Sequence, residues 1–472
     1  MKFHKTFIPL ILFIAVLIGV GFSFYSKLVM ERPKRITIDP TLQIDPDKEY
    51  SITVWDYSFP GKVGEFSNYS EFVAAIISEF RGIYPNINIS FRLFDENELK
   101  DSLHKEEPPD LLCAPYILDP NENRLMFPIG LFLNEDEKAN YEVFPLEAVR
   151  IDNMIWALPR WISPTLWLGN AKLLRNAGVD LEGVLTKGWT WEEFHNTLVE
   201  LEKKTSHTST QEYGLLLPYY PLWLFQDLIL NNGVPAMLST DGQFLWDETS
   251  VRDTARFLKQ LQETRGFCRE PEPFYGKILH LMLTDKIAIM GRTNLPLLKE
   301  LANNSRELLP LPMPHNSVKE WRIQTDVFYV SLFKNKREKG DDHLKAAAEF
   351  GKFLTTGKAA ALGGELGFLS ASRLDQEAAI KSINVSPLAE TFLYTCLSHG
   401  ITSINLPQEL QEKEEKFTKE VLLPAVKELL EEKSSLEEFT VTIIDEGKER
   451  FAVQEKPNGS FGFFKRLYER FF

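Results

Sequence analysis

Segments of strand length alternate with segments of helical period early in the chain, and this order limits the fold more than any other feature. Apolar residues alternate with polar ones or form short runs in 51–58, 87–94 and 110–116, which predicts three strands. Between them, 69–80 and 96–105 place apolar residues at helical spacing. This order is typical of a mostly parallel sheet with helices on both faces, so we expect an α/β fold.

A second series of the same kind runs from about Ile155 to Leu311. By the same periodicities, strands are expected at 154–158, 165–169, 212–217 and 286–290, and a helix at 250–262. Thr190 and Glu193 form a capping box, which fixes the start of another helix. Two α/β units are therefore predicted in a chain whose length suggests about three domains.

The last part of the chain is expected to be mainly helical. A strand over 325–333 leads into a helix over 341–357, and residues 376–453 are predicted as helices. The charged run 408–432 is most simply a solvated helix face with pairs of opposite charge four residues apart. A helical C-terminal part thus follows the two α/β units.

The net charge of −14 is unevenly distributed. Residues 1–35 hold six cations and one Glu, a net charge of +5, which leaves −19 for residues 36–472. An acidic body argues against binding along a nucleic-acid backbone, because such binding depends on clustered Lys and Arg. We therefore exclude nucleic acid as a partner.

The N-terminal segment is long and apolar enough to cross a membrane. Thr6–Tyr25 contains no charge and follows Lys2 and Lys5, so residues 1–26 form either an uncleaved anchor or a signal peptide. Gly21–Ser23 offers small residues at a spacing that a signal peptidase accepts. Because no Cys follows the apolar run, a lipid-modified cysteine cannot form. We expect an extracytoplasmic body after a linker over 27–47, either tethered or secreted.

Residues that would indicate catalysis, metal binding or a disulfide framework are missing from the sequence. None of the nucleotide-binding, serine-hydrolase or zinc-protease motifs occurs, and the eight histidines have no metal-ligand spacing. The three cysteines, Cys113, Cys268 and Cys396, lie in apolar stretches and are expected to be small buried residues. An enzyme has no positive support.

Aromatic residues follow several of the expected strands. Trp55, Asp56 and Tyr57 end the first strand, Tyr116 follows the third, and Trp161 follows the strand at 154–158. Ligands of open α/β sheets bind outside the carboxyl ends of strands, and aromatic faces there suit the flat C–H surfaces of a sugar. The same residues could instead belong to the core, and both alternatives stay open.

Seven segments, in order along the chain, resemble the extracellular solute-binding proteins of bacterial carbohydrate ABC transporters, the family that includes maltose-binding protein. The first three are an opening strand (51–58), a helix followed by a Pro turn and a strand (74–91), and a strand entered by Pro-Asp (108–116). The next two are the crossover into the second lobe (154–180) and a helix that starts with Thr, Trp and acidic residues (188–205). The last two are a strand containing Ala and Met (285–294) and a pair of helices (343–372). The resemblance covers about Glu49 to Arg373.

The resemblance implies a periplasmic-binding-protein-like clamshell with two lobes, mixed sheets and a helical C-terminal part. Lobe one would hold 48–159 and 325–375, lobe two 160–324, and helices in 376–453 would brace both lobes. The chain would cross between lobes near Pro159 and Gln324. Carried over by position, the ligand-binding candidates are Trp55, Asp56, Tyr57, Tyr116, Trp161, Trp223, Asp227, Gly291, Arg292 and Thr293.

The implied function is capture of a carbohydrate between the lobes and its delivery to a membrane permease, by a monomer that needs no cofactor. One alternative is a ligand sensor of the same fold that signals to a membrane partner. A less favoured one is a glycan-acting enzyme at the cell surface.

The tail at 454–472 has no counterpart in the resemblance. It carries Phe461, Phe463, Phe464, Tyr468, Phe471 and Phe472 together with Lys465, Arg466 and Arg470. This aromatic and basic segment could be an amphipathic helix on the membrane or permease. It could equally pack onto the acidic body.

Overall fold

The computed structural model describes residues 38–39, 42–118, 125–205, 213–216, 221–234, 236–264, 280–302, 307–334, 339–402 and 406–452. The N-terminal segment 1–26, most of the linker 27–47, Cys268 and the tail 454–472 lie outside the described residues. Among the described helices, none is both long and apolar enough to cross a membrane. The described residues from 43 onward form one compact unit, and the description below concerns this unit.

Eight strands of the described chain form a large mixed sheet, and we call the part built on it lobe one. In order across the sheet, its main strands are β13 (Leu369–Ser370), β7 (Ala157–Pro164), β12 (Ile323–Phe333), β3 (Leu111–Ala114), β1 (Tyr50–Tyr57) and β2 (Ile87–Phe94). β14 (Gly400–Thr402) and β4 (Met126–Phe127) also pair with β12. β1 is parallel to β2 and β3, whereas β12 is antiparallel to β3 and β7. The expected α/β fold with mixed sheets is confirmed.

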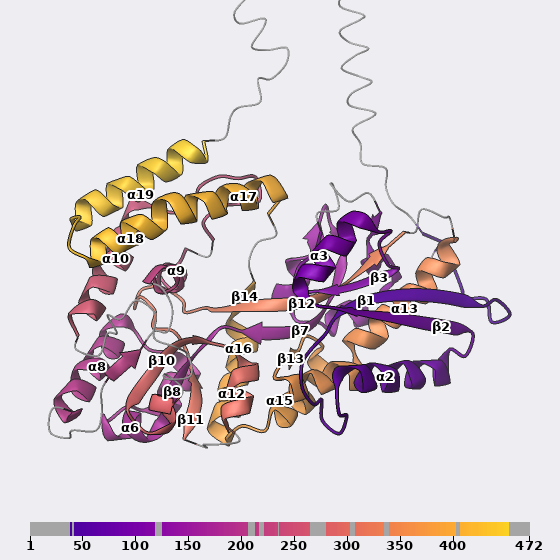
Figure 1. The fold of residues 1–472 in the computed structure, drawn as a ribbon, viewed down its shortest axis with the longest axis horizontal. Coiled ribbons are helices and arrows are strands. Elements are labelled where there is room, and N and C mark those ends of the chain that lie inside the picture. The colour runs from indigo at the N-terminus through magenta and orange to yellow at the C-terminus, as the bar shows by residue number, and fades with distance from the viewer. Residues whose placement is uncertain are drawn as a thin grey trace, which may run out of the picture. The chain divides into compact units, whose positions relative to one another are not determined.

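Helices cover both faces of this sheet. α2 (Tyr69–Ile83) and α3 (Glu96–Lys105) lie on opposite sides of it, and α13 (Asp341–Thr355) packs on β12 and β7 (Figure 1). The side chain of Asn68 accepts from a backbone N–H in the first turn and fixes the start of α2. The smaller elements of lobe one are η1 (Ile129–Phe132), α4 (Glu135–Ala139), α5 (Val143–Glu147), β5 (Arg150–Ile151), β6 (Met154–Ile155), α14 (Gly357–Ala361), η2 (Leu362–Leu366) and η3 (Arg373–Asp375).

Four strands within the described ranges form the second sheet, and we call the part built on it lobe two. Their order is β11 (Leu308–Leu311), β8 (Leu166–Asn170), β10 (Ile287–Thr293) and β9 (Tyr213–Leu216). The helices of lobe two are α6 (Ala171–Asn176), α7 (Leu181–Lys187), α8 (Trp191–Thr205), α9 (Pro221–Leu230), α10 (Glu248–Glu263) and α12 (Leu295–Ala302). The predicted capping box is confirmed at the start of α8, where Thr190 and Glu193 exchange hydrogen bonds between side chains and backbone.

The chain passes between the two sheets at identifiable residues. β7 of lobe one continues into β8 of lobe two at Thr165, a few residues after Pro159, which itself pairs within the large sheet. The return from β11 to β12 spans 312–322 and ends just before Gln324, which pairs with Ile401 of β14. β7, β12 and β14 therefore meet where the lobes join.

The C-terminal part contacts both lobes. α15 (Gln376–Ile383) packs on η2 and β13 of lobe one, and α16 (Pro387–His399) packs on α7 and β11 of lobe two. α17 (Gln408–Phe417), α18 (Leu423–Leu430) and α19 (Leu436–Arg450) cluster beside α9 and α10 (Figure 1). The strand β14 was not expected between helices, because its three residues gain strand geometry only by pairing with β12.

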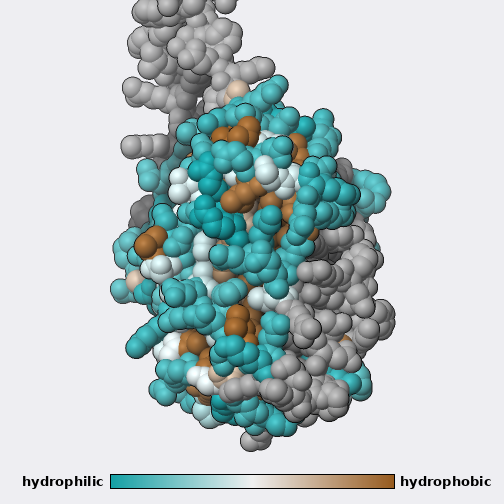
Figure 2. All heavy atoms as spheres, turned by 90° about the vertical axis from the view of Figure 1, so that its left-hand side faces the viewer, coloured by the Kyte–Doolittle hydropathy of each residue, from teal (hydrophilic) through white to brown (hydrophobic). Residues whose placement is uncertain are grey.

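The charged run is a solvated face, as predicted. Lys413 pairs with Glu409, and Lys419 with Glu415, each four residues apart. A π-helical turn, η4 (Thr418–Leu422), separates α17 from α18, which has a Pro at its start and so lacks a backbone donor there. The face that carries α8, α10 and α19 is mainly hydrophilic, with hydrophobic residues scattered in small groups (Figure 2).

Candidate functional site

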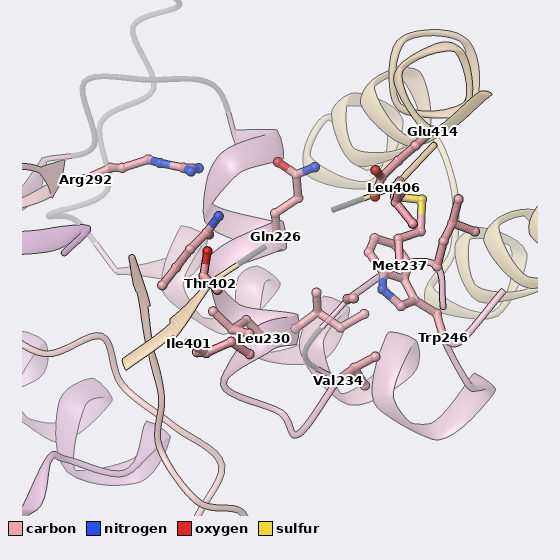
Figure 3. Close-up of a pocket in the computed structure, with 14 residues that line it drawn as sticks. Gln226, Leu230, Val234, Met237, Trp246, Arg292, Ile401, Thr402, Leu406 and Glu414 are labelled. Carbon is pink, nitrogen blue, oxygen red and sulfur yellow. The ribbon is translucent and has the colours of Figure 1, made fainter. Parts of the chain in front are cut away.

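A pocket of about 190 Å³ lies where lobe two meets the strands that join the lobes. Its lining comes from α9 and the segment after it, from β10, from β12 and β14, and from the C-terminal part (Figure 3): Gln226, Ile229, Leu230, Val234, Ala236, Met237, Leu238, Trp246, Arg292, Gln324, Ile401, Thr402, Leu406 and Glu414. The polar side chains enter from different elements, while apolar side chains of α9 and its neighbours form the rest. Such a mixture is typical of small-molecule sites.

Arg292 reaches this pocket because β10 is irregular at that point. The pairing of β10 with β8 shifts between Met290 and Thr293, and Arg292 has a φ of 40°, a conformation that costs a side-chain-bearing residue about 1–3 kcal/mol. Figure 3 shows the guanidinium extended toward Gln226. A bulge that turns one strand residue out of the sheet often aims a side chain at a site. The local backbone thus sets the position of Arg292.

Asp227 is the carboxylate partner of Arg292. Its side chain is 2% exposed, and an Arg292 guanidinium nitrogen lies 3.5 Å from its Oδ1. Burial raises the pKa of Asp227 to about 7, and the Arg292 charge opposes this rise. The pKa of Asp326 on β12, a residue with an exposed side, is also raised by desolvation from its surroundings, again opposed by Arg292. Arg292 of lobe two therefore acts electrostatically on carboxylates of both lobes.

We expect the stability contribution of Asp227 to decrease as the pH rises from about 4 to about 7. The folded state binds the Asp227 proton more tightly than the unfolded state, so stability is greatest below the unfolded pKa and is lost as the carboxyl ionises. The slope would be at most about 1.4 kcal/mol per pH unit. Urea unfolding at pH 5 and pH 8 should show that the free energy of unfolding decreases less between these two pH values for Asp227→Asn than for the wild type. An equal loss in both proteins would contradict this assignment.

Half-buried aromatic side chains lie on the lobe-one side of the joining strands. Phe59 makes edge-to-face contacts with Phe328 at 5.5 Å and with Trp161 at 5.7 Å between ring centroids. Tyr57 contacts Phe328 edge-on at 6.5 Å, and Phe368 stacks on Trp161 at 5.6 Å. Tyr57, Phe59 and Phe328 remain partly exposed, whereas Trp161 is 0% exposed. Within this cluster, Tyr57, Phe59 and Phe328 provide the accessible aromatic surface.

Asp56 lies in a buried ion pair. Its Oδ2 accepts from Arg160 at 2.8 Å and from the Tyr69 hydroxyl at 2.7 Å. Burial alone would lower the pKa of Arg160, but Tyr69 and Asp56 raise it above its ordinary value. Arg160 also lies 3.8 Å from the ring centroid of Trp161. Asp56 and Trp161 are thus joined through Arg160 inside lobe one.

The other predicted site residues are dispersed. Trp55 is 7% exposed and packs on Phe94 of β2 at 5.0 Å. Tyr116 is half-buried after β3, and Gly291 and Thr293 are buried on β10 beside Arg292. Trp223 belongs to α9, and its side chain lies outside the described part. The structure brings Asp227, Gly291, Arg292 and Thr293 together, and Tyr57 close to the cluster around Trp161. Of the ten predicted residues, Arg292 alone is among the described residues that line the pocket.

Several residues of the pocket or of the neighbouring aromatic cluster were not predicted from the sequence. Phe59 could have been found, because it lies just beyond the first strand like Tyr57. Gln324 and Phe328 lie on the expected strand 325–333 or next to it, but nothing in their pattern marks them. Glu414 lies within the charged run, and burial, followed by Glu415, raises its pKa. Among the described residues, no group of three His, Cys, Asp or Glu side chains could hold a metal ion.

Neither a protein-family model nor a curated protein matches this sequence. Solved structures do match its fold. The sugar-binding protein MalE from Xanthomonas citri is 14% identical with a TM-score of 0.67, over 89% of this chain and 99% of that one. The cyclic alpha-maltosyl-1,6-maltose binding protein from Arthrobacter globiformis is 13% identical with a TM-score of 0.67, over 85% and 99%.

A third similar structure is an ABC substrate-binding protein from Listeria monocytogenes in complex with cycloalternan. It is 14% identical with a TM-score of 0.59, over 86% of this chain and 100% of that chain. These structures are matched almost over their whole length, so the correspondence concerns the complete fold. The resemblance found in the sequence is confirmed at the level of the fold: this chain has the two-lobed α/β fold of maltose-binding-protein-like solute-binding proteins.

Proposed function

We propose that this protein is the extracytoplasmic substrate-binding component of an ABC importer and captures a carbohydrate between its lobes. The observation that carries the proposal is the pocket at the junction of the lobes, where Arg292, Gln226, Gln324 and Glu414 converge. The fold shared with sugar-binding proteins supports it.

The chemistry of the pocket suits a polyhydroxylated solute. Amides both donate and accept, carboxylates accept, and a guanidinium donates along fixed directions, so together they can distinguish patterns of hydroxyl groups. On the lobe-one side, outside the residues that line the pocket, the half-buried rings of Tyr57, Phe59 and Phe328 would offer flat apolar faces to the C–H side of a sugar ring. We assign Arg292 to ligand orientation, with the buried Asp227 holding its guanidinium, and Tyr57 to stacking.

Ligand capture would be coupled to lobe closure. The lining combines lobe two with the joining strands β12 and β14, so a ligand there can have a higher affinity for the closed state and shift the population toward it. In this proposal the closed monomer docks on a membrane permease and needs no cofactor. The segment 1–26 tethers the body to the membrane or is cleaved on export.

A thermal-shift screen of the full chain in detergent, with mono- and oligosaccharides including maltotriose and cyclic tetrasaccharides, tests the carbohydrate class. A bound sugar at 100 times its dissociation constant should add about 2.7 kcal/mol to the free energy of unfolding. No shift with any carbohydrate would contradict the proposal. Release of a shortened glycan during incubation would instead indicate an enzyme.

Arg292→Ala should weaken binding of any sugar found in the screen by about tenfold or more, because a charge-assisted hydrogen bond is worth about 1.5–3 kcal/mol. Arg175→Ala is the matched control, since Arg175 is an exposed arginine of lobe two that pairs with Glu307 outside the pocket. Isothermal titration calorimetry measures both. Equal affinities for the two variants would show that Arg292 does not contact the ligand.

A further inference from the structure

A second contact between the lobes lies outside the pocket. It joins α12 of lobe two to η2 and the turn after it in lobe one, and to the end of α15, the helix of the C-terminal part that packs on lobe one. Lys299 on α12 lies 3.2 Å from Glu365 on η2 and donates to the carbonyl oxygen of Ser382 on α15. Lys299 and Glu365 are 20% and 28% exposed, so this ion pair is more shielded than most surface pairs.

The contact satisfies groups that lobe one leaves open. Ser382 belongs to the last turn of α15 (Gln376–Ile383), where carbonyl groups lack partners within the helix and carry a partial negative charge. A cation from another element is favoured there. Lys299 of lobe two therefore caps a helix that packs on lobe one and neutralises Glu365 at the same time.

Backbone meets backbone directly beside this ion pair. Gly367 has a φ of 85°, and a Cβ atom built on it would lie 2.6 Å from Cα and 2.7 Å from N of Pro296 in α12. Only a glycine permits this approach without movement of one lobe against the other. Side chains can rotate away from a clash, but two backbones cannot. The contact of Gly367 with Pro296 therefore limits how closely the two lobes approach each other at this point.

The contact of α12 with Gly367 connects elements that carry the candidate ligand groups. α12 begins two residues after Thr293, and Arg292 lies on the strand that leads into it. Gly367 is followed by Phe368, which stacks on Trp161 and contacts Phe59 at 5.5 Å. A change in the spacing of α12 and Gly367 would therefore move Arg292 relative to the aromatic side chains of lobe one.

We propose that the contact of α12 with Gly367, held by Lys299 and Glu365, sets the resting angle between the lobes. Lys299 and Gly367 are positioning residues, which act on the ligand site through β10 and Phe368. This inference rests on the proposed function for its effect on affinity, but not for its effect on lobe geometry.

Pulsed dipolar spectroscopy on the ligand-free full chain in detergent measures the resting geometry. Spin labels would be attached through non-canonical residues at Arg81 on α2 and Glu182 on α7, both exposed. Gly367→Ala should move the main inter-lobe distance. Gly61→Ala is its control, because Gly61 has a φ of 88° with nothing within 4 Å, so it shares the backbone strain without the contact.

Lys299→Met provides a second variant that does not depend on the glycine. It should move or broaden the distance distribution, because it removes the charge that joins the lobes while retaining much of the apolar chain. Lys352→Met is the control, since Lys352 pairs with Glu137 at 2.8 Å within lobe one. Unchanged distributions for both Gly367→Ala and Lys299→Met would overturn the inference.

The affinity for maltotriose separates this inference from the proposed function. A shift in distance for the two test variants, together with a change of about fivefold or more in affinity, supports both. A shift in distance in a protein that binds no sugar supports the resting-angle contact and contradicts carbohydrate capture. Sugar binding with unchanged distances supports carbohydrate capture and contradicts the resting-angle contact.

Discussion

Asp56→Asn is expected to lower the free energy of unfolding by about 3–5 kcal/mol. The substitution leaves the Arg160 guanidinium, which is 1% exposed, without its carboxylate at 2.8 Å and without a route to water. The Tyr69 hydroxyl, which donates to the same carboxylate, would also lose a charged acceptor. Urea unfolding followed by tryptophan fluorescence measures the change.

Glu307→Gln is the control for this substitution. Glu307 also pairs with an arginine, Arg175, at 3.0 Å, but the two side chains are 50% and 56% exposed. An exposed pair contributes about 0–1 kcal/mol, so the control should change stability little. A similar small loss for Asp56→Asn would mean that Asp56 is hydrated and open to a ligand.

Trp161→Ala is expected to cost about 3–5 kcal/mol of stability, the range for removing a buried aromatic side chain. Trp161 is 0% exposed and contacts Phe59, Phe328, Phe368 and Arg160. Its removal would leave a cavity beside the joining strands, so any loss of sugar affinity would follow from loss of structure. Thermal and urea unfolding should both report the loss.

Tyr394→Ala is the matched control, because Tyr394 is an aromatic residue of α16 that is 45% exposed. Its substitution should change stability by less than about 0.5 kcal/mol. If Trp161→Ala behaved like this control yet abolished sugar binding, Trp161 would be a ligand contact in an open cleft rather than a core residue.

Local sequence patterns predicted the elements of the fold well. The strand expected at 51–58 is β1 (Tyr50–Tyr57), and the helix expected at 96–105 is α3 (Glu96–Lys105). Hydrophobic period and caps are properties of neighbouring residues, so one sequence displays them directly. The capping box at Thr190 and the charge pairs of the run 408–432 were predictable for the same reason.

The site could be predicted only in part, because burial and pairing depend on residues far apart in sequence. Asp56 and Arg160 are separated by 104 positions, and no sequence pattern around either residue predicts their ion pair. Arg292 became a candidate through the resemblance, and the bulge that turns it toward the pocket arises from the pairing of β10 with β8. Glu414 approaches the pocket only through the packing of α17.

The most direct test of carbohydrate capture is calorimetric titration of the full chain in detergent with each sugar that shifts its melting temperature. We predict saturable binding of one carbohydrate per chain, without turnover, which Arg292→Ala weakens by about tenfold or more and Arg175→Ala leaves unchanged. Absence of heat for every carbohydrate, or equal binding by both variants, would contradict a sugar site at the junction of the lobes.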